Sequence, residues 1–99
     1  MKVIVMHHVW PEVLASAEWY QMEEMGVGAR FVERISEALT KIGKAPFLYP
    51  VLYRDARRME IRGFPYGVFY VVRGDAIYVF SLHHLKRNPR LWKRRIPAD

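Results

Sequence analysis

Apolar residues recur at helical spacing through the second quarter of the chain. They fall at i, i+4, i+7, i+8 and i+11: Phe31, Ile35, Ala38, Leu39 and Ile42. Charged residues occupy the intervening positions, which is typical of an amphipathic helix that buries one stripe in a core. A break at Gly26-Val27-Gly28 precedes this helix, and Gly43 supplies a C-terminal stop.

A strand and another helix are expected before that break. Residues 2–6 are apolar and β-prone on both faces, which predicts a short buried strand. Pro11 suits the first turn of a helix and Glu12 favours its positive end, so a helix is expected over about 11–25. Because only a short break separates the two helices, we expect an antiparallel helical hairpin lying on a sheet.

The second half of the chain changes to a period of two. Apolar and charged residues alternate from 58 to 63, which predicts a half-exposed, basic strand. Residues 68–73 and 76–82 predict two further strands, and Gly74-Asp75 fits a two-residue hairpin between them. The stretch 44–54 contains Pro46 and Pro50, so it is expected to be a packed connector and not a central strand.

Pro89 can open a short C-terminal helix over 90–95, with Trp92 as its one large apolar residue. Trp92 could stack on a base, but an anchor that pins this helix to the sheet is the favoured interpretation. The predicted order is βααβββα. The fold class is α+β, with a helical hairpin packed on a small, mainly antiparallel sheet and a short C-terminal helix.

Length and composition narrow the classes of protein. A chain of 99 residues is expected to form a single domain over 1–99. Without cysteine it has no disulfide, thiolate zinc site or cysteine nucleophile, which fits a reducing cytoplasm. Residues 1–6 are too short and too polar in their flanks for a signal peptide. The glycine-rich break lacks a third glycine and a preceding strand, so no cofactor is expected. No metal is expected either, because no acidic residue lies close in sequence to His7-His8 to complete a metal shell.

The charge is unevenly distributed along the chain. Residues 1–53 hold 5 Lys/Arg against 6 Asp/Glu, a net charge of −1. Residues 54–99 hold 11 against 4, a net charge of +7. An asymmetry of this kind attracts phosphate backbones or acidic peptides and says nothing by itself about the fold.

Two segments of the second half of the chain, taken in their order, resemble those of a known protein family. Residues 57–72 read RRMEIRGFPYGVFYVV, and residues 82–92 read LHHLKRNPRLW. Together with Glu18-Trp19-Tyr20 and Tyr49-Pro50, they resemble toxins of the RelE/ParE family of the plasmid-stabilisation type. The resemblance spans nearly the whole chain. It implies the toxin of a type II toxin-antitoxin pair, which a cognate antitoxin silences by wrapping it with an acidic or amphipathic segment.

The resemblance leaves two modes of growth inhibition open. ParE-like relatives poison DNA gyrase, whereas RelE-like relatives act as ribosome-dependent endoribonucleases that cut mRNA. RNA-cutting relatives place His or Tyr at the end of the last strand, which His83 or His84 matches. They also place an arginine where this chain has Gly67. That departure favours gyrase, and a non-toxic basic RNA-binding or scaffold domain is a further alternative.

If the chain cuts RNA, a proton acceptor, a proton donor and cations must meet at the phosphorus. His83, His84, Arg58 and Arg62 are the candidate catalytic residues. The competing interpretation is structural: the histidines form a polar strand end, with neighbouring side chains on opposite faces.

Two binding surfaces are also expected. A target or phosphate surface is predicted at six cations: Arg57, Lys86, Arg87, Arg90, Lys93 and Arg94. Crowded cations repel one another, so an acidic partner explains them better than a solvated face does. An antitoxin or dimer surface is predicted on the outer side of the helical hairpin: Val13, Ala17, Tyr20, Met22 and Met25.

Overall fold

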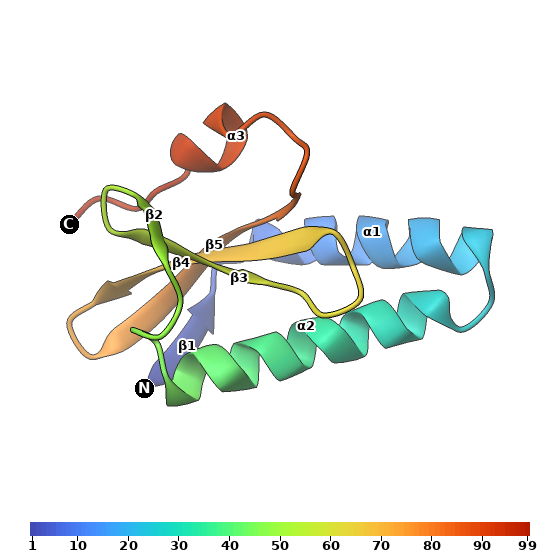
Figure 1. Ribbon diagram of the computed structural model, residues 1–99, viewed down its shortest axis with the longest axis horizontal. Helices are drawn as coiled ribbons and strands as arrows, with labels where there is room; N and C mark the ends of the chain where they lie inside the picture. The colour runs from blue at the N-terminus through green and yellow to red at the C-terminus, as the bar shows by residue number, and fades with distance from the viewer.

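A computed structural model describes all residues, 1–99, as three helices and five strands (Figure 1). The elements are β1 Lys2–Val5, α1 Val9–Glu23, α2 Val27–Lys44, β2 Val51–Tyr53, β3 Ala56–Glu60, β4 Tyr66–Arg73, β5 Ala76–His84 and α3 Arg90–Lys93. The strands form one sheet in the order β1-β5-β4-β3-β2. β1 runs parallel to β5, and every other neighbouring pair is antiparallel.

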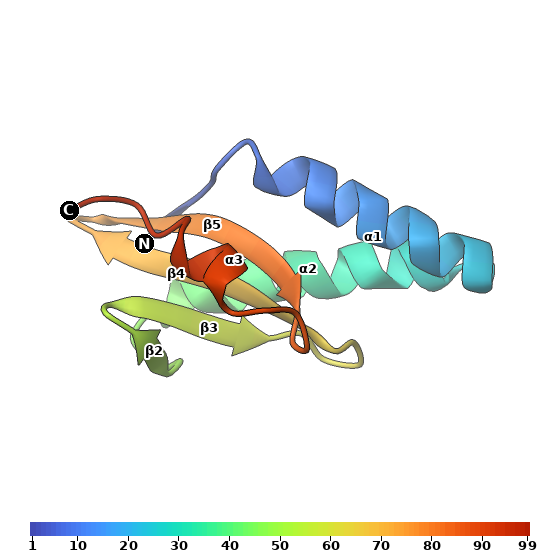
Figure 2. The same cartoon turned by 90° about the horizontal axis from the view of Figure 1, so that it is seen from above.

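The sheet separates two layers of different size. α1 and α2 cover one face, here called the helix face, and their connected ends project beyond the sheet (Figures 1 and 2). α3 and the C-terminal tail lie over the other face, here called the α3 face (Figure 2). The predicted helical hairpin on a mainly antiparallel sheet, closed by a short C-terminal helix, is therefore confirmed.

Glycines let the two long helices approach each other. A Cβ atom at Gly28 would lie 2.5 Å from the carbonyl oxygen of Ala17, so only glycine permits this crossing. The side-chain oxygen of Gln21 accepts hydrogen bonds from the N–H groups of Gly26 and Gly28, at 3.0 and 3.2 Å. These bonds satisfy donors at the start of α2. None of the three helices combines the length and apolar content needed to cross a lipid bilayer.

The main core lies between the hairpin and the helix face. Twelve buried residues form it: Val9, Val13, Phe31, Ile35, Ala38, Ile42, Ile61, Val68, Tyr70, Ile77, Val79 and Leu82. The α2 stripe expected from its periodicity points inward, with Phe31 and Ile42 fully buried. Rings of Tyr20, Phe64 and Tyr66 surround Phe31 at centroid distances of 5.4, 5.1 and 5.1 Å. The periodic pattern thus identified the largest apolar contact of the fold.

A smaller core lies on the α3 face. Its five buried residues are Ala56, Phe69, Val71, Phe80 and Trp92. The Trp92 ring stacks on Phe69 with centroids 4.6 Å apart and planes 22° apart. Trp92 is 7% exposed, so the predicted anchoring role is confirmed and the ring is not a free platform for a base.

An irregularity in β5 decides which side chains reach the α3 face. Phe69 is paired with Ser81, but the next residue, Tyr70, is paired with Val79, so Phe80 is an extra residue. Ser81 therefore lies on the α3 face with Phe80, and alternation places His83 there as well. Without this bulge the end of β5 would present the opposite set of side chains.

The connector between α2 and the sheet differs from the prediction. Residues 44–54 were expected to be a packed connector, but they contain the edge strand β2, and Phe47 and Leu48 are 64% and 72% exposed. The proline argument still holds in part, because β2 is outermost in the sheet. Pro50 needs no N–H there, and its carbonyl accepts a hydrogen bond from the Arg58 N–H at 3.2 Å.

Candidate functional site

The end of β5 carries the two histidines that the sequence singles out. His83 is 3% exposed and lies on the α3 face, whereas His84 is half-buried. The His84 ring meets Tyr66 edge-on at 5.3 Å, and Tyr66 packs against the main core on the helix face. The two imidazoles therefore point to opposite faces, as neighbours on a strand must.

His83 belongs to a closed polar ring. Its Nδ1 atom lies 2.6 Å from the Ser81 hydroxyl, and its Nε2 atom lies 3.5 Å from a carboxylate oxygen of Glu12. One nitrogen of the Arg95 guanidinium donates to both Glu12 oxygens at 2.8 Å and to the Ser81 hydroxyl at 3.3 Å. Glu12 on α1 and Arg95 after α3 thus meet around the free end of β5.

Burial controls the protonation of His83. Removal of the ring from water lowers its pKa below the ordinary 6.5, and the neighbouring Arg95 and Arg87 lower it further. Glu12 acts in the opposite direction but does not overcome the burial. The ring is neutral at neutral pH, and its two nitrogens already face Ser81 and Glu12, so its evident role is to hold this corner together.

His84 faces a more open site. A cavity of about 190 Å³ lies between α1 and the end of β5. Its lining is Glu12, Ala15, Ser16, Tyr66, Leu82, His83, His84 and Arg87. The His84 Nδ1 atom accepts the Lys86 N–H at 3.1 Å, which orients the ring and leaves Nε2 for a ligand. No group of three or more His, Asp or Glu side chains in residues 1–99 is arranged to hold a metal ion.

Arg58 fills the place above Gly67. A Cβ atom at Gly67 would lie 2.8 Å from the Arg58 Cδ atom, so the Arg58 stem crosses directly over the glycine. Its guanidinium pairs with Glu60 at 3.3 Å, and its Nε atom is buried with no hydrogen-bond partner. The position at which RNA-cutting relatives are expected to carry arginine is thus covered by an arginine from the neighbouring strand.

The other predicted arginines are not gathered at the histidines. Arg62 is 68% exposed and turns toward α2, where it lies 3.7 Å from Glu37. Arg57 donates to the carbonyls of Phe47 and Tyr49 at 3.2 and 2.7 Å, so it secures the connector. The structure therefore separates Arg62 and Arg57 from the end of β5, whereas Arg58 shares the α3 face with His83.

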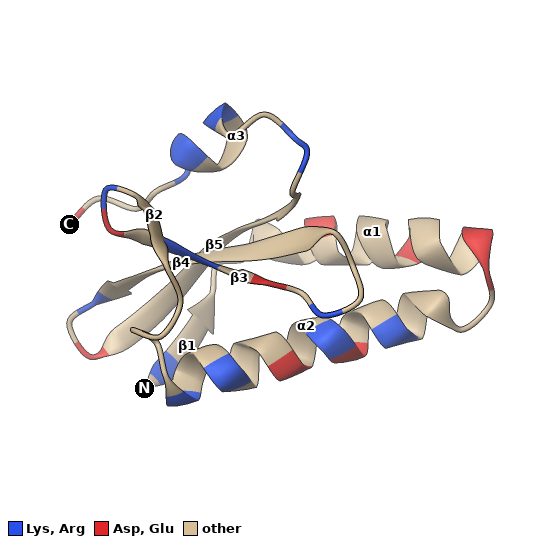
Figure 3. Ribbon diagram, in the orientation of Figure 1, with Lys and Arg blue, Asp and Glu red and all other residues tan.

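The segment after β5 forms a basic surface. Five cations on it are exposed, and none has a carboxylate within ion-pair distance: Lys86, Arg87, Arg90, Lys93 and Arg94. Two residues before α3, the Asn88 side chain accepts the Arg90 N–H at 3.0 Å, which fixes the segment's path. Figure 3 shows blue along this segment and α3, only red on α1, and both colours on α2. The charge asymmetry read from the sequence is therefore also an asymmetry in space.

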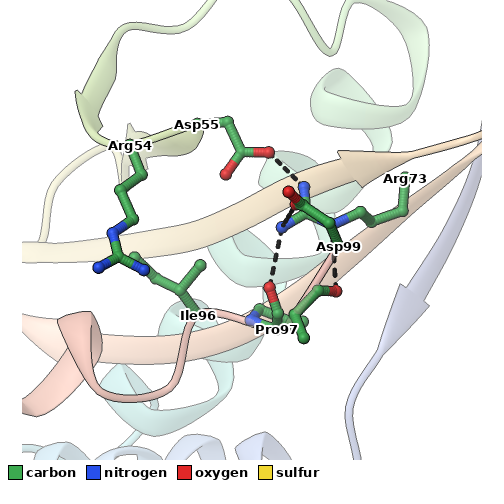
Figure 4. A pocket seen from close by; sticks show the side chains of 7 residues that line it. Arg54, Asp55, Arg73, Ile96, Pro97 and Asp99 are labelled. Atoms are coloured by element: carbon green, nitrogen blue, oxygen red, sulfur yellow. Dashed lines mark hydrogen bonds and ion pairs between the residues drawn. The ribbon is translucent and has the colours of Figure 1, made fainter.

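A second cluster holds the C-terminal tail at the opposite end of the sheet (Figure 4). Arg73 pairs with Asp55 and with Asp99, the latter at 3.1 Å. It also donates to the carbonyls of Pro97 and Ala98, at 2.8 and 3.4 Å. The cavity here has a volume of about 550 Å³, but both of its carboxylates, Asp55 and Asp99, are already paired with Arg73, so its evident role is to clamp the tail.

The predicted antitoxin surface is only partly on the outside. Val13 is 4% exposed, so its assignment as a surface residue is wrong, and Ala17 and Tyr20 pack against the same core. Met22 and Met25 are 87% and 88% exposed, as expected. Three further apolar residues are also exposed on α1: Trp10, Leu14 and Trp19. The helical spacing of Val13, Ala17 and Tyr20 marked the inner face of α1, because a spacing alone does not say which side is buried.

Sequence reasoning missed three residues of the polar ring. Glu12 was interpreted as a charge at a helix start, Arg95 as the last residue of the predicted C-terminal helix, and Ser81 was not considered. They meet through a bulge and through contacts that span 83 residues, as between Glu12 and Arg95. No pattern of neighbouring residues predicts a contact between segments so far apart in the sequence.

Comparison with known proteins adds a result on the fold. No protein-family model and no curated protein sequence matches the chain. Among solved structures, it superimposes on a chain of the chromosomal ParDE TA system from P. aeruginosa with a TM-score of 0.64. That match is 10% identical and covers 85% of this chain and 95% of the other. The chain has the RelE/ParE fold.

A second structure of this RelE/ParE fold is similar over more of the chain. It is the isolated E. coli RelE toxin, with a TM-score of 0.59 and 14% identity, covering 94% of this chain and 93% of RelE. At such identities the likeness is one of fold. The resemblance stated from the sequence is thus supported by the three-dimensional arrangement of nearly the whole chain.

Proposed function

We propose that this chain is the toxin of a type II toxin-antitoxin pair that acts in the cytoplasm and is neutralised by a cognate antitoxin protein. The observation that carries the proposal is the exposed, unpaired basic segment from Lys86 to Arg94 on a RelE/ParE fold. Five uncompensated cations on one segment repel one another and are explained by an acidic or phosphate-bearing target.

DNA gyrase is the target that we favour, and the mode of action is binding. The proposal is supported by the state of the candidate catalytic groups. His83 is buried and neutral within the polar ring, Arg62 pairs with Glu37 and Arg58 pairs with Glu60. None of these three is free to act on a substrate in this arrangement, whereas the basic segment is open to a partner.

RNA cleavage on the ribosome is the second candidate, because one observation favours it. The cavity beside β5 brings His84 together with Glu12 and Arg87. An imidazole and a carboxylate can share proton transfer, and an arginine can stabilise charge on a phosphate.

Inducible expression in a bacterial host tests the toxin proposal. We expect growth arrest that co-expression of the antitoxin, encoded by the neighbouring open reading frame, reverses. The doubly substituted Arg90→Ala/Arg94→Ala chain should lose most of this effect. Its matched control is Lys41→Ala/Lys44→Ala, which removes two unpaired cations from the outer side of α2. Normal growth with the wild-type chain would leave a non-toxic RNA-binding or scaffold domain.

Purified protein separates the two targets. Inhibition of DNA supercoiling at stoichiometric concentrations would support gyrase, and codon-phased cuts in translated mRNA would support the ribosome. If RNA is cut, His84→Gln should slow cutting at least tenfold, because His84 lines the open cavity. His83→Gln serves as the comparison, and a loss caused by His83→Gln alone would contradict the structural role given to that ring.

The exposed apolar side of α1 is the proposed antitoxin surface. Met22 and Trp19 remain accessible there, as does Met25 in the turn after α1, and flexible methionines adapt to a partner's side chains. Amide shifts of the labelled chain during titration with antitoxin should concentrate in α1. Unchanged α1 signals in a saturated complex would remove this surface from the proposal.

A further inference from the structure

The outer edge of the sheet carries an exposed apolar strip. Five large side chains within seven residues form this edge strip: Phe47 at 64% exposure, Leu48 at 72%, Val51 at 48%, Leu52 at 40% and Tyr53 at 38%. Scattered exposed apolar residues are ordinary on protein surfaces, but contiguous ones mark interaction sites. The strip lies at β2, the strand farthest from β1 in the sheet (Figures 1 and 2).

β2 also offers free backbone groups. Val51 is paired with Arg57, and the hydrogen bond of this pair runs from the Arg58 N–H to the Pro50 carbonyl. Val51 therefore occupies a non-hydrogen-bonded position, so its own N–H and C=O point away from β3. Nothing follows β2 in the sheet, and these groups face outward from an open edge.

Cations flank the strip without carboxylate partners. The Lys93 ammonium lies 4.5 Å and the Arg54 guanidinium 5.4 Å from the centre of the Tyr53 ring. Neither has an acidic group within ion-pair distance, and the adjacent Asp55 is engaged by Arg73. An acidic side chain placed beside β2 would meet two uncompensated positive charges.

The two faces of β2 differ in chemistry. Tyr53 contacts Trp92 and is paired with Ala56 of the smaller core, so it lies on the α3 face, beside Lys93. The register shifts between Tyr53 and Val51, which makes Leu52 an extra residue, and Val51, paired with Arg57, points to the helix face. Arg57 also belongs to that face, since it is paired with Tyr70, and its guanidinium lies 5.3 Å from the Phe47 ring. One side of the edge is thus cationic and the other mainly apolar.

We propose that β2 is a docking edge for an extended segment of a partner protein in which acidic and apolar residues alternate. The segment adds a strand beside β2, bonded through the Val51 backbone. Alternation places its acidic residues near Lys93 and Arg54 and its apolar residues near Val51 and Phe47.

Other occupants fit less well. A second copy paired through β2 would bring the same cations of both chains together, and like charges oppose such a pair. Single-stranded RNA would use Tyr53 and the cations, but it would leave the three aliphatic side chains and the free backbone bonds unexplained. The inference goes beyond the proposed toxin function and holds whether or not the chain arrests growth.

A peptide titration of the full chain tests the proposal. The probe is an acetylated and amidated octapeptide of alternating glutamate and valine, added to the 15N-labelled protein. We expect amide shifts concentrated at residues 51–53, and a Kd that rises at least fivefold for Lys93→Glu. Val51→Pro, which removes the outward N–H, should weaken binding at least tenfold, whereas its matched control Val51→Thr should stay within twofold.

A change in the probe guards against misfolded variants. The same peptide with N-methyl groups on alternate amides cannot complete the strand pairing, so it should bind the unaltered protein at least tenfold more weakly. Equal affinity of the methylated peptide, or shifts confined to α1 and α2, would overturn the proposal. So would a hexanucleotide RNA that shifts residues 51–53 at lower concentration than the peptide. None of these outcomes alters the result of the growth assay.

Discussion

The helix face and the α3 face of the same sheet are closed by different means. Twelve buried residues fill the helix face, and the Tyr70 hydroxyl, their one polar group, donates to the Pro46 carbonyl at 2.6 Å. Burial raises the pKa of Tyr70 to about 12, as expected in a water-free layer. The α3 face has five buried apolar residues, and polar contacts at Glu12 and Arg73 hold its tail.

Apolar burial and partly exposed ion pairs contribute different free energies to the stability of the two faces. Each large apolar side chain buried on the helix face contributes about 1.5 to 3 kcal/mol. Ion pairs with partly exposed partners contribute at most about 1 kcal/mol, and Arg95 and Glu12 retain 34% and 21% of their side-chain exposure. We therefore expect the helix face to set global stability. The α3 face can open locally, and it carries the cations that a partner would meet.

The largest expected effect is on the helix face. Phe31→Ala empties the centre of the aromatic cluster and should lower the free energy of unfolding by about 3 to 5 kcal/mol. Val32→Ala, one position along the same helix and 43% exposed, is the matched control and should cost less than about 1 kcal/mol. Urea denaturation measures both free energies of unfolding. Equal losses for the two variants would contradict the greater contribution assigned to the buried position.

Loss of the α3 anchor should be smaller and more local. Trp92→Ala removes the stack on Phe69 and is expected to cost about 2 to 3 kcal/mol, less than a central core residue because α3 can detach from the sheet. Hydrogen exchange should show lost protection around α3, with α2 unchanged. Simultaneous loss of protection in both helices would show that the two faces unfold as one unit.

Acidification should test the polar ring. Since burial lowers the pKa of His83 in the folded state, the unfolded chain binds more protons at mildly acidic pH. The contribution of His83 to the free energy of unfolding is therefore complete above about pH 6.5. It declines as the pH falls from there through the lower pKa of the folded state. His83→Gln should flatten this part of the profile in urea titrations between pH 8 and 5. An unchanged slope would mean that His83 does not contribute to the pH dependence.

The smallest change in stability is expected for the basic segment. Arg90→Ala/Arg94→Ala should alter the free energy of unfolding by no more than about 0.5 kcal/mol, because both side chains are exposed and unpaired. If the segment contacts phosphates, the salt dependence of nucleic-acid affinity should become shallower by about two units of slope. A large loss of stability would instead assign these residues to the fold.

Several features followed from local patterns. The Phe31 to Ile42 stripe predicted α2. The alternation over 58–63 predicted the strand that became β3, and the apolar runs 68–73 and 76–82 predicted β4 and β5. The strand β2 was not predicted, because Pro46 and Pro50 argued against a central strand and the segment was interpreted as a connector; β2 is an edge strand that begins after Pro50. The helical spacing in α1 marked its buried side, which was mistaken for a partner surface at Val13.

The sequence by itself determined the helical hairpin, the meander and the concentration of positive charge after residue 54, because periodicity and charge are properties of neighbouring residues. Only the tertiary structure decided that His83 turns inward to Glu12 and Arg95, that Arg58 covers Gly67, and that β2 is left as an open edge. Those outcomes depend on register shifts in the sheet and on contacts between segments far apart in the chain, which no local pattern of residues predicts.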